Sequence, residues 1–329
     1  MNMNNFKNLN ELDFTKPRKN ETLNPNWVTG FIDGEGSFII ALISSTTKKK
    51  VSLRLSVTQK SHSQGVLYEL KEFFGCGQVI PSSKDCLRFV VQSNKDITKK
   101  IIPHFTNYPL QTSKELNFES LKRAALIVSK GVHLSSEGLN EIVNLKNSMN
   151  KNRSFDEQYN HLLLNKDKVK LNPYWVLGFV DAEGTFGSLI TKSSIVKGEK
   201  ELEKIVTRSR LSISQSTHDV FILQHIKNFF KAGYLDPKET EIDTLDKAKI
   251  CRDSSFYYNS TPESFMSFFE DYTLLTRKLL DFIDFKQFYL FKKEKYYLTE
   301  KGFEEMLSLS SRMNSGRDDI NKSRKKRIN

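Results

Sequence analysis

The same motif occurs twice in this chain, and the duplication constrains the fold more than any other feature. Leu23–Phe38 reads LNPNWVTGFIDGEGSF and Leu171–Phe186 reads LNPYWVLGFVDAEGTF, with eleven of the sixteen positions identical. The only two tryptophans of the sequence, Trp27 and Trp175, occupy the same place in the two copies. The repeat predicts two homologous segments in which the motif has the same structural role.

Similarity between the two segments continues well beyond this motif. Arg54–His62 (RLSVTQKSH) matches Arg210–His218 (RLSISQSTH). The pattern Tyr-x-Leu-x-Thr-x-Lys occurs at Tyr108–Lys114 and again at Tyr272–Lys278. The repeating unit is about 140 residues, far too long for a solenoid repeat, so the sequence predicts a domain duplicated in tandem.

The distance between matching residues grows along the chain, from 148 at the first motif to 156 and then 164. The second copy must therefore carry two net insertions of eight residues. We place one between Phe186 and Arg208 and the other between Gly233 and Tyr272, within Leu235–Lys249. Both stretches are rich in lysine and glutamate, as surface hairpin tips and loops tend to be.

These matches divide the chain into five parts. We expect an N-terminal extension over residues 1–22, a first half-domain over 23–150, a polar and charged linker over 151–170, a second half-domain over 171–314 and a basic tail over 315–329. Because the two halves already supply a pseudo-two-fold interface, the protein is predicted to be a monomer with no obligate protein partner.

The charge balance points to a polyanionic partner. Lys and Arg number 51 against 39 Asp and Glu, which gives a formal net charge of +12. Such an excess favours DNA, RNA or an anionic surface. No apolar run reaches the ~18–20 residues that span a bilayer, and the N-terminus lacks a signal-peptide core, so neither a membrane protein nor a secreted one is expected. Three cysteines without a CxxC pair argue against a disulfide framework or a zinc ribbon.

Local patterns within one half predict the order αββαββα with one or two extra helices. Asn24 and Pro25 are a good N-cap and first helical residue for a helix that ends near Gly34. The following segments are expected as strands 38–43, 51–57, 77–80 and 87–92 and as helices 66–74, 97–105, 114–129 and 135–150. The fold class is therefore α+β, with two curved antiparallel sheets that together form a long concave polar surface.

Strict alternation in the second strand of each half separates a core face from a polar face. Side chains of this polar face offer the hydrogen-bond donors and acceptors that read base edges in a major groove. The predicted DNA contacts are Ser52, Arg54, Ser56 and Thr58 in the first half and Arg208, Arg210, Ser212 and Ser214 in the second.

Small residues one turn apart in each motif helix, Gly30 and Gly34 and then Gly178 and Ala182, favour direct packing of the two helices. This packing would bring Glu35 and Glu183, at the helix ends, to one place on the floor of a basic groove. A pair of carboxylates repels DNA phosphate unless divalent cations lie between them. Hard oxygen ligands suit Mg²⁺, which can promote phosphodiester hydrolysis.

GFIDGEGSF and GFVDAEGTF resemble the two motifs of the LAGLIDADG homing endonucleases in their monomeric, two-motif form, over about Leu23–Asn314. The resemblance implies a saddle-shaped, metal-dependent DNA endonuclease that cuts both strands of a long asymmetric double-stranded target and promotes the mobility of its host intron. It implies Mg²⁺ as the cofactor, with Mn²⁺ able to substitute and Ca²⁺ able to occupy the sites without supporting cleavage.

The resemblance also assigns roles to individual residues. Metal ligands would be the carboxylates of Glu35 and Glu183 and the backbone carbonyls of Gly34 and Ala182. By position, Gln59 and Gln215 would orient water, and Lys114 and Lys278 would stabilise charge in the transition state. Independently, both glutamines stand where strand alternation calls for an apolar residue, which favours an active-site role over the alternative that each only marks a strand end.

Two other functions use the same features. An RNA-splicing maturase would bind intron RNA on the same saddle without cleaving DNA, and a transcription-factor-like protein would only bind DNA. Retention of both glutamates favours the nuclease. By analogy with the family, the protein is expected to be encoded in a fungal mitochondrial intron.

Overall fold

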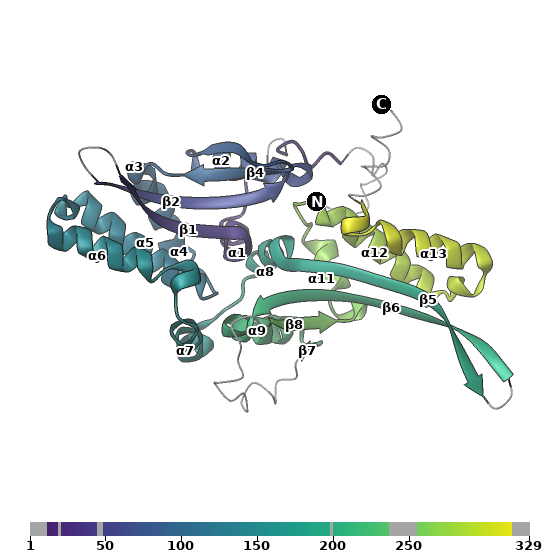
Figure 1. The fold of residues 1–329 in the computed structure, drawn as a ribbon. Coiled ribbons are helices and arrows are strands. Elements are labelled where there is room, and N and C mark those ends of the chain that lie inside the picture. Colours follow the sequence, from purple (N-terminus) through teal and green to yellow (C-terminus); the bar gives the residue numbers. More distant parts are fainter. Residues whose placement is uncertain (1–11, 19–20, 45–48, 198–199, 237–254, 318–329) are drawn as a thin grey trace.

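The computed structural model describes residues 12–18, 21–44, 49–197, 200–236 and 255–317, and it has the predicted α+β architecture. Figure 1 shows two similar halves that meet at the centre of the molecule, with their long hairpins extending in opposite directions. The first half contains α1 (Pro25–Glu35), β1 (Gly36–Ser44), β2 (Lys49–Lys60), α2 (Gly65–Phe74), β3 (Gln78–Ser83), β4 (Cys86–Val91), α3 (Asn94–Asp96), a π-helical segment (Ile97–Ile101), α4 (Ile102–Asn107), α5 (Lys114–Ser129) and α6 (Ser136–Asn147). The second contains α8 (Pro173–Glu183), β5 (Gly184–Lys197), β6 (Lys200–Ser216), α9 (Val220–Phe230), β7 (Tyr234–Asp236), β8 (Ser255–Ser260), α11 (Met266–Asp271), α12 (Lys278–Lys293) and α13 (Glu300–Arg312).

Each half builds one four-stranded antiparallel sheet, with the order β1-β2-β4-β3 in the first and β5-β6-β8-β7 in the second. The alternation predicted for β2 is confirmed on its apolar side. Val51, Leu53, Leu55 and Val57 are all buried. Phe38 lies opposite Leu55 in the register, and its ring contacts Phe105 of α4 and Phe118 of α5, so helices cover this face of the sheet.

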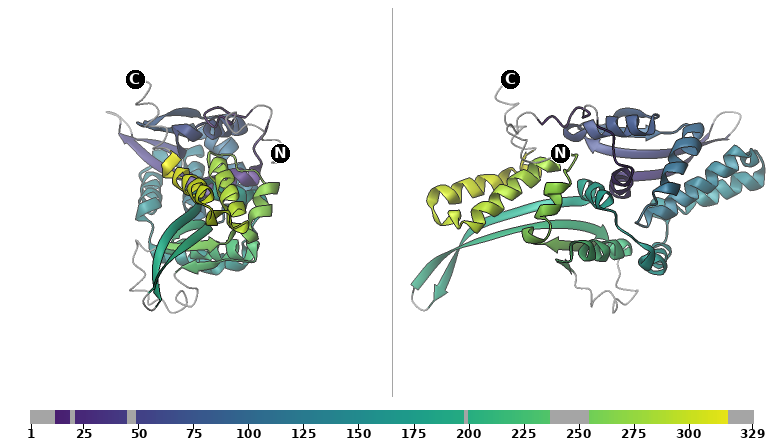
Figure 2. Two further views of the ribbon diagram at one scale, coloured as in Figure 1. Left: turned by 90° about the vertical axis from the view of Figure 1, so that its right-hand side faces the viewer. Right: turned by 180° about the vertical axis from the view of Figure 1, so that it is seen from behind.

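The first predicted insertion lengthens the β5–β6 hairpin. Strand β5 has fourteen residues where β1 has nine, and β6 has seventeen where β2 has twelve. The longer hairpin projects well beyond the rest of the second half (Figures 1 and 2). The second predicted insertion, within 235–249, falls almost wholly outside the described residues.

The two motif helices pack directly on each other, as the small residues predicted. A Cβ atom built on Gly30 would lie 2.1 Å from the carbonyl oxygen of Trp175, and one on Gly178 would lie 2.2 Å from that of Trp27. No side chain could fit at either position without moving a backbone. The glycines therefore allow the two halves to share one continuous core.

The segment between the halves is more ordered than a polar linker. Residues 155–165 form helix α7 (Phe155–Asn165), capped by the Ser154 hydroxyl, which accepts from the N–H of Glu157. The ring of Tyr159 contacts Phe221 of α9, so this helix packs against the second half. Among the described residues, no helix is both long and apolar enough to cross a membrane.

The repeat also extends further than Asn150 and Asn314. The side-chain amide of Asn150 donates to the Phe38 carbonyl, and that of Asn314 donates to the Phe186 carbonyl, both at 2.9 Å. Three residues later, Arg153 donates to Asn117, and Arg317 pairs with Asp281. The predicted basic tail therefore begins with an anchored segment, and its remainder, 318–329, lies outside the described residues.

Replacing Gly30 with alanine should destabilise the protein by about 1–3 kcal/mol or more, because the added methyl group overlaps the Trp175 carbonyl. Urea unfolding of the variant would measure the loss. Gly187→Ala is the matched control, since its nearest neighbour would lie 3.9 Å away. Equal stability of the two variants would contradict the close approach of the helices.

Candidate metal-dependent nuclease site

Glu35 and Glu183 are the last residues of the two packed helices. Each helix starts in the same way, with an asparagine side chain (Asn24 or Asn172) that accepts the N–H two residues later and with proline at the first helical position. Each ends as the following glycine adopts an extended conformation and begins a strand. The equal length of eleven residues and the direct packing place both carboxylates at the same end of the helix pair.

Asp33 and Asp181, two residues before the glutamates, line the two pockets but use their carboxylates to join the halves. Asp33 accepts a hydrogen bond from the Trp175 indole at 2.8 Å, and Asp181 accepts one from Trp27 at 3.0 Å. Each also accepts the N–H and hydroxyl of a threonine in its own half, Thr112 or Thr276. The aspartate of each motif is therefore structural, and it binds the tryptophan of the opposite half across the pseudo-two-fold axis.

The two glutamates carry charge that the free protein does not fully compensate. Burial raises the pKa of Glu35 above its ordinary value, and the nearby negative charge of Glu183 raises it further. Burial also raises the pKa of Glu183, although Lys278 and Lys114 oppose this. Both carboxylates end their helices, where the helix dipole is negative. The arrangement favours either protonation or a cation at this place.

Lys114 and Lys278 lie against the backbone of the motif helices. The ammonium group of Lys114 donates to the carbonyls of Ile32 at 3.0 Å and Gly34 at 2.7 Å. Lys278 donates to Val180 at 3.2 Å and Ala182 at 2.6 Å. The carbonyls expected to bind metal therefore already accept a lysine in each half. Burial lowers the pKa of both lysines, and the acidic residues around them oppose the shift.

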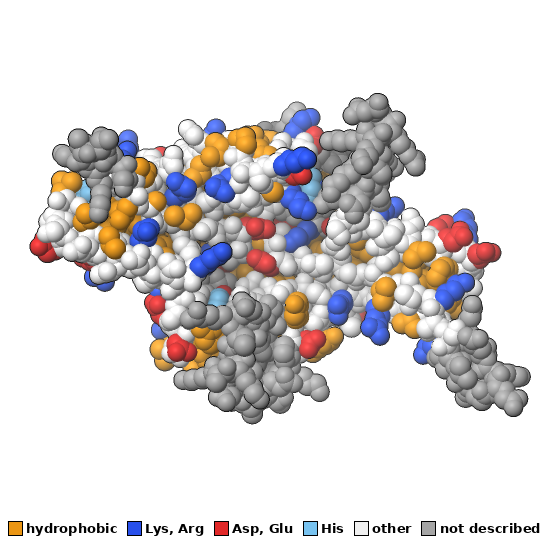
Figure 3. Space-filling view, viewed as in Figure 1, with side chains coloured by type: hydrophobic (Ala, Val, Ile, Leu, Met, Phe, Trp, Pro, Cys, Tyr) orange, Lys and Arg blue, Asp and Glu red, His pale blue; other side chains and the backbone are white. Residues whose placement is uncertain are grey.

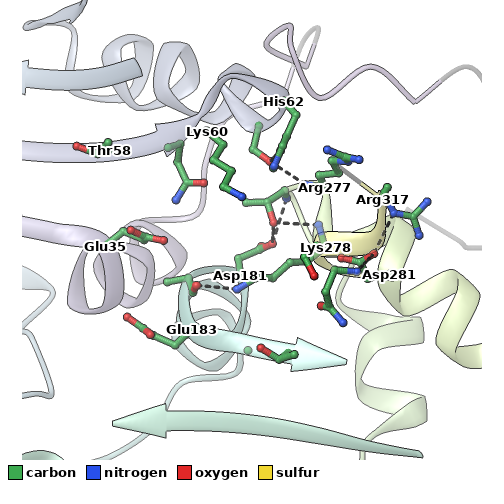
Figure 4. A pocket seen from close by; sticks show the side chains of 18 of the residues that line it. Glu35, Thr58, Lys60, His62, Asp181, Glu183, Arg277, Lys278, Asp281 and Arg317 are labelled. Carbon is green, nitrogen blue, oxygen red and sulfur yellow. Dashed lines mark hydrogen bonds and ion pairs between the residues drawn. The ribbon is translucent and has the colours of Figure 1, made fainter. Parts of the chain in front are cut away.

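Two related pockets lie at the ends of the motif helices, and both glutamates line the first of them. The Gln59 pocket is lined by Gln59, His62, Arg277, Lys278 and both glutamates (Figure 4). The Gln215 pocket is lined by Gln215, His218, Asp219, Ser113 and Lys114.

Each pocket combines the end of the second strand of one half with the start of the long helix of the other. The structure thus brings each predicted glutamine near the predicted lysine of the opposite half.

The DNA contacts predicted on the two sheets differ in exposure. Arg208 and Arg210 are exposed, and a groove lined by Arg210, Ser212 and Ser214 continues from Glu183 along the second sheet. In the first sheet Arg54 and Thr58 are partly exposed, whereas Ser52 and Ser56 are only 8% and 6% exposed. Neighbouring side chains on the same face cover these two serines more than strand alternation alone suggests.

Sequence reasoning missed several polar groups beside these residues. Arg88 of β4 lies opposite Thr58 and donates to its hydroxyl at 3.3 Å, so it belongs to the same face. Arg277 and Asp219 line the pockets next to predicted residues. Strand pairing across the sheet would have identified Arg88, but nothing in the sequence indicates that Arg277 and Asp219 meet the opposite half. Figure 3 shows acidic side chains at the middle of one face with lysines and arginines around them.

The donors present fit a hard divalent cation only in part. Among the described residues, no three His, Cys, Asp or Glu side chains lie together as a metal site. Two carboxylates with backbone carbonyls suit Mg²⁺, which keeps water molecules and takes phosphate oxygens as further ligands. Water molecules and phosphate oxygens would therefore have to complete the coordination of the ion.

A pseudo-symmetric pair of sheets with two carboxylates at the ends of packed motif helices defines the class of LAGLIDADG proteins in their single-chain form. The chain belongs to the LAGLIDADG endonuclease family, whose model matches residues 28–125 and 176–289. Members of this family depend on divalent metal.

The relatives agree with this assignment over most of the chain. A Neurospora crassa protein named "Probable intron-encoded endonuclease 3" is 29% identical over 92% of this chain, and "Probable intron-encoded endonuclease 2" of the same fungus is 27% identical over 88%. The alignments span 57% and 65% of those two proteins. The crystal structure of the I-SmaMI LAGLIDADG homing endonuclease bound to cleaved DNA has a TM-score of 0.74 and 28% identity, and covers 91% of this chain and all of that one.

Replacing Glu35 and Glu183 with glutamine should raise the free energy of unfolding of the metal-free protein at pH 8. A raised pKa means that the folded state binds the proton more tightly than the unfolded state does. The contribution of these two groups to the free energy of unfolding is therefore greatest at low pH and is lost as the pH rises through the raised pKa. Urea denaturation without divalent metal should therefore give a higher free energy of unfolding for the double variant than for the native protein at pH 8. The difference should shrink towards pH 4.

Glu137→Gln is a control that should change the free energy of unfolding at pH 8 in the opposite direction. Hydrogen bonds from its own backbone N–H and from the Ser136 hydroxyl lower the pKa of Glu137, so its charge stabilises the folded state at pH 8. Should the double variant instead be less stable than the native protein at pH 8, the glutamates would not be an uncompensated pair.

Proposed function

We propose that this protein is a site-specific DNA endonuclease that hydrolyses both strands of a long, asymmetric double-stranded target. One observation carries the proposal: Glu35 and Glu183 lie at equivalent ends of two packed helices, between two sheets whose polar faces bear arginines. A partly buried acidic pair in a protein of net charge +12 has no structural purpose, whereas a metal-dependent nuclease requires one.

Mg²⁺ is the cation that these donors suit best, with Mn²⁺ as a substitute and Ca²⁺ as an inert occupant. The ligands would be the carboxylates of Glu35 and Glu183 and the carbonyls of Gly34 and Ala182. Each carbonyl oxygen has two lone pairs, so one can accept Lys114 or Lys278 while the other faces a cation. When bound, the ion activates water and stabilises the leaving oxygen. One solved structure is of I-SmaMI bound to an uncleaved DNA target in the presence of calcium ions.

The remaining pocket residues have supporting roles. Gln59 makes a hydrogen bond with Glu35, which fixes the amide where it can orient a water molecule. Gln215 occupies the equivalent place in the other pocket. Lys114 and Lys278 bring positive charge to the scissile phosphates and would stabilise the charge that develops there. Solved structures of I-SmaMI include single and double lysine-to-alanine variants.

Recognition of the target would fall to the two sheet faces. Arg208 and Arg210, with Ser212 and Ser214, form the polar surface of the second sheet, and Arg54 and Thr58 form its counterpart on the first, where Ser52 and Ser56 are largely covered. Arg88 adds a guanidinium beside Thr58. Arginine pairs with guanine edges, and hydroxyls bond to several bases, so the faces can read sequence.

We also propose that the protein is encoded in a fungal mitochondrial intron and promotes the mobility of that intron. Two relatives are named intron-encoded endonucleases of a fungus, and a third, 27% identical over 56% of this chain, is named "Uncharacterized mitochondrial protein RF1" in Saccharomyces cerevisiae. A maturase that binds intron RNA on the same surface is the second candidate. Both glutamates are present, and a maturase without nuclease activity has no use for them.

The double variant Glu35→Gln, Glu183→Gln should lose cleavage by about 10³-fold or more and keep its affinity for DNA, because the amides preserve shape but not the charge that holds metal. Cleavage of a target obtained by selection from random DNA, with Mg²⁺, would be measured beside binding with Ca²⁺. Glu137→Gln, on the exposed α6 surface, is the control and should cut normally.

Single changes distinguish two versions of the site. If both glutamates share the metals, Glu35→Gln should slow cleavage of both strands, as close packing at Gly30 and Gly178 favours. If the sites are independent, it should leave a strand-specific nickase. Normal cutting of both strands by the double variant would refute the role of the glutamates in cleavage, whereas a native protein that cuts neither strand would favour the maturase.

A further inference from the structure

One row of side chains crosses each sheet beside the candidate water-orienting glutamine, and its composition differs between the halves. We call it the inner row. In the first sheet the inner row consists of the cross-strand partners Thr58, Arg88 and Ile80. In the second sheet it consists of Ser214, Tyr257 and Asp236. Residues directly opposite each other on neighbouring strands point to the same side of a sheet, so both rows lie on the face that would meet DNA.

Two glycines show that the inner rows occupy equivalent places. Gly77 and Gly233 match in the repeat, and both adopt a positive φ, of 83° and 93°. Ile80 and Asp236 each follow their glycine by three residues. At one equivalent position, therefore, the first sheet carries an apolar side chain and the second an acidic one.

Asp236 brings a negative charge to a surface that would otherwise attract DNA. It is exposed and lines the groove that also contains Arg210 and Tyr257. Within the described parts of the chain, its carboxylate has no hydrogen-bond or ion-pair partner, and Arg210 does not pair with it. An uncompensated carboxylate repels the phosphates of every duplex alike. Asp236 therefore lowers affinity for DNA unless a base donates a hydrogen bond to it.

Protection of the sheet edge does not account for this aspartate. Strand β7 is an edge strand of the second sheet, and a charge on an edge strand can prevent pairing with another chain. Strand β3 is an edge strand of the first sheet in the same way, yet it carries Ile80 there, with 39% of the residue exposed. The fold thus accepts an apolar residue at this position, and the aspartate indicates a difference in what the two faces bind.

In the first inner row, Arg88 is fixed as a hydrogen-bond donor. Its Nε donates to the Thr58 hydroxyl at 3.3 Å, and its Nη2 donates to the Ser82 hydroxyl at 2.8 Å. These two bonds orient the guanidinium and leave its other N–H groups for a ligand. Guanine offers the acceptors O6 and N7 in the major groove, and arginine is their usual partner.

We propose that the inner rows make the two halves select different bases near the cleavage sites, guanine at Arg88 and cytosine at Asp236. This inference rests on the proposed nuclease function. Cytosine presents an amino donor to the major groove, which a carboxylate can accept, whereas O6 and N7 of guanine would repel it. Adenine places the acceptor N7 beside its amino group, so a carboxylate suits it less well than cytosine. Asp236 thus weakens binding to most sequences and restores it for one base.

The test compares base preference in binding and in cleavage. Selection from random DNA gives a reference target, and duplexes with each position changed in turn are bound with Ca²⁺ and cut with Mg²⁺. The native protein should prefer cytosine by about tenfold at one position in the half-site of the second sheet. Asp236→Ala should abolish that preference and raise the affinity for the other three bases. Asp236→Asn should move the preference to adenine, because an amide can accept from the amino group and donate to N7.

Arg88→Ala provides the reciprocal measurement in the first half. It should abolish a preference for guanine at an equal distance on the other side of the cleavage centre. Two exposed residues away from the sheet faces serve as controls of equal charge. Asp271→Asn, in the pocket at the starts of the motif helices, and Arg123→Ala, on α5, should leave every base preference unchanged.

A merely structural role of Asp236 would lower affinity for all sequences together, whereas recognition changes the preference at one position and raises affinity for the others. An Asp236→Ala protein that keeps the native preference at every position, or weakens binding to all duplexes alike, would overturn the inference. A native protein that cuts its selected target leaves the nuclease function standing in either case. If it cuts no duplex and selects no sequence, the nuclease function itself is overturned, and this inference with it.

Discussion

Helices α1 and α8 approach so closely at Gly30 and Gly178 that the backbone of one helix occupies the place of a side chain on the other. Every feature of the site depends on this contact. It puts Glu35 beside Glu183, and it allows the Trp27 and Trp175 indoles to reach the aspartates of the opposite half. It also brings the strand end of each half against the long helix of the other. Two halves joined by a flexible tether, without this contact, would have no shared pocket.

The same contact makes the site electrostatically demanding. Two helix ends and two carboxylates meet at a place where burial raises the pKa of both glutamates, and the buried lysines balance only part of the charge. Replacing the carboxylates with apolar residues would remove this cost and would leave the packing intact. An acidic pair held in this way therefore indicates a chemical function for the protein, because no structural need accounts for it.

Much of this arrangement was predictable because the duplication shows each pattern twice. The motif helices, the glycine stripe and the core face of β2 follow from local spacing. Helix α7 was also open to prediction, since Ser154 and Glu157 form a typical helix start, and a longer comparison of the repeats would have found Arg153 and Arg317. The pairing of Ser113 with Asp219 was not predictable, because residues 106 positions apart meet only through the packing of two halves. Burial of Ser52 and Ser56 likewise depends on neighbours across the sheet.

The β5–β6 hairpin is longer than the β1–β2 hairpin, so the second half extends further from the centre of the molecule than the first. Strand β5 is fourteen residues long against nine for β1, and at ~3.3 Å per residue the difference is roughly 17 Å. Along a duplex with a rise of ~3.4 Å per base pair, that length corresponds to about five base pairs. A groove that holds DNA along both sheets would therefore cover more of the duplex on the side of the second half. The scissile bonds would then lie off the centre of the protected stretch.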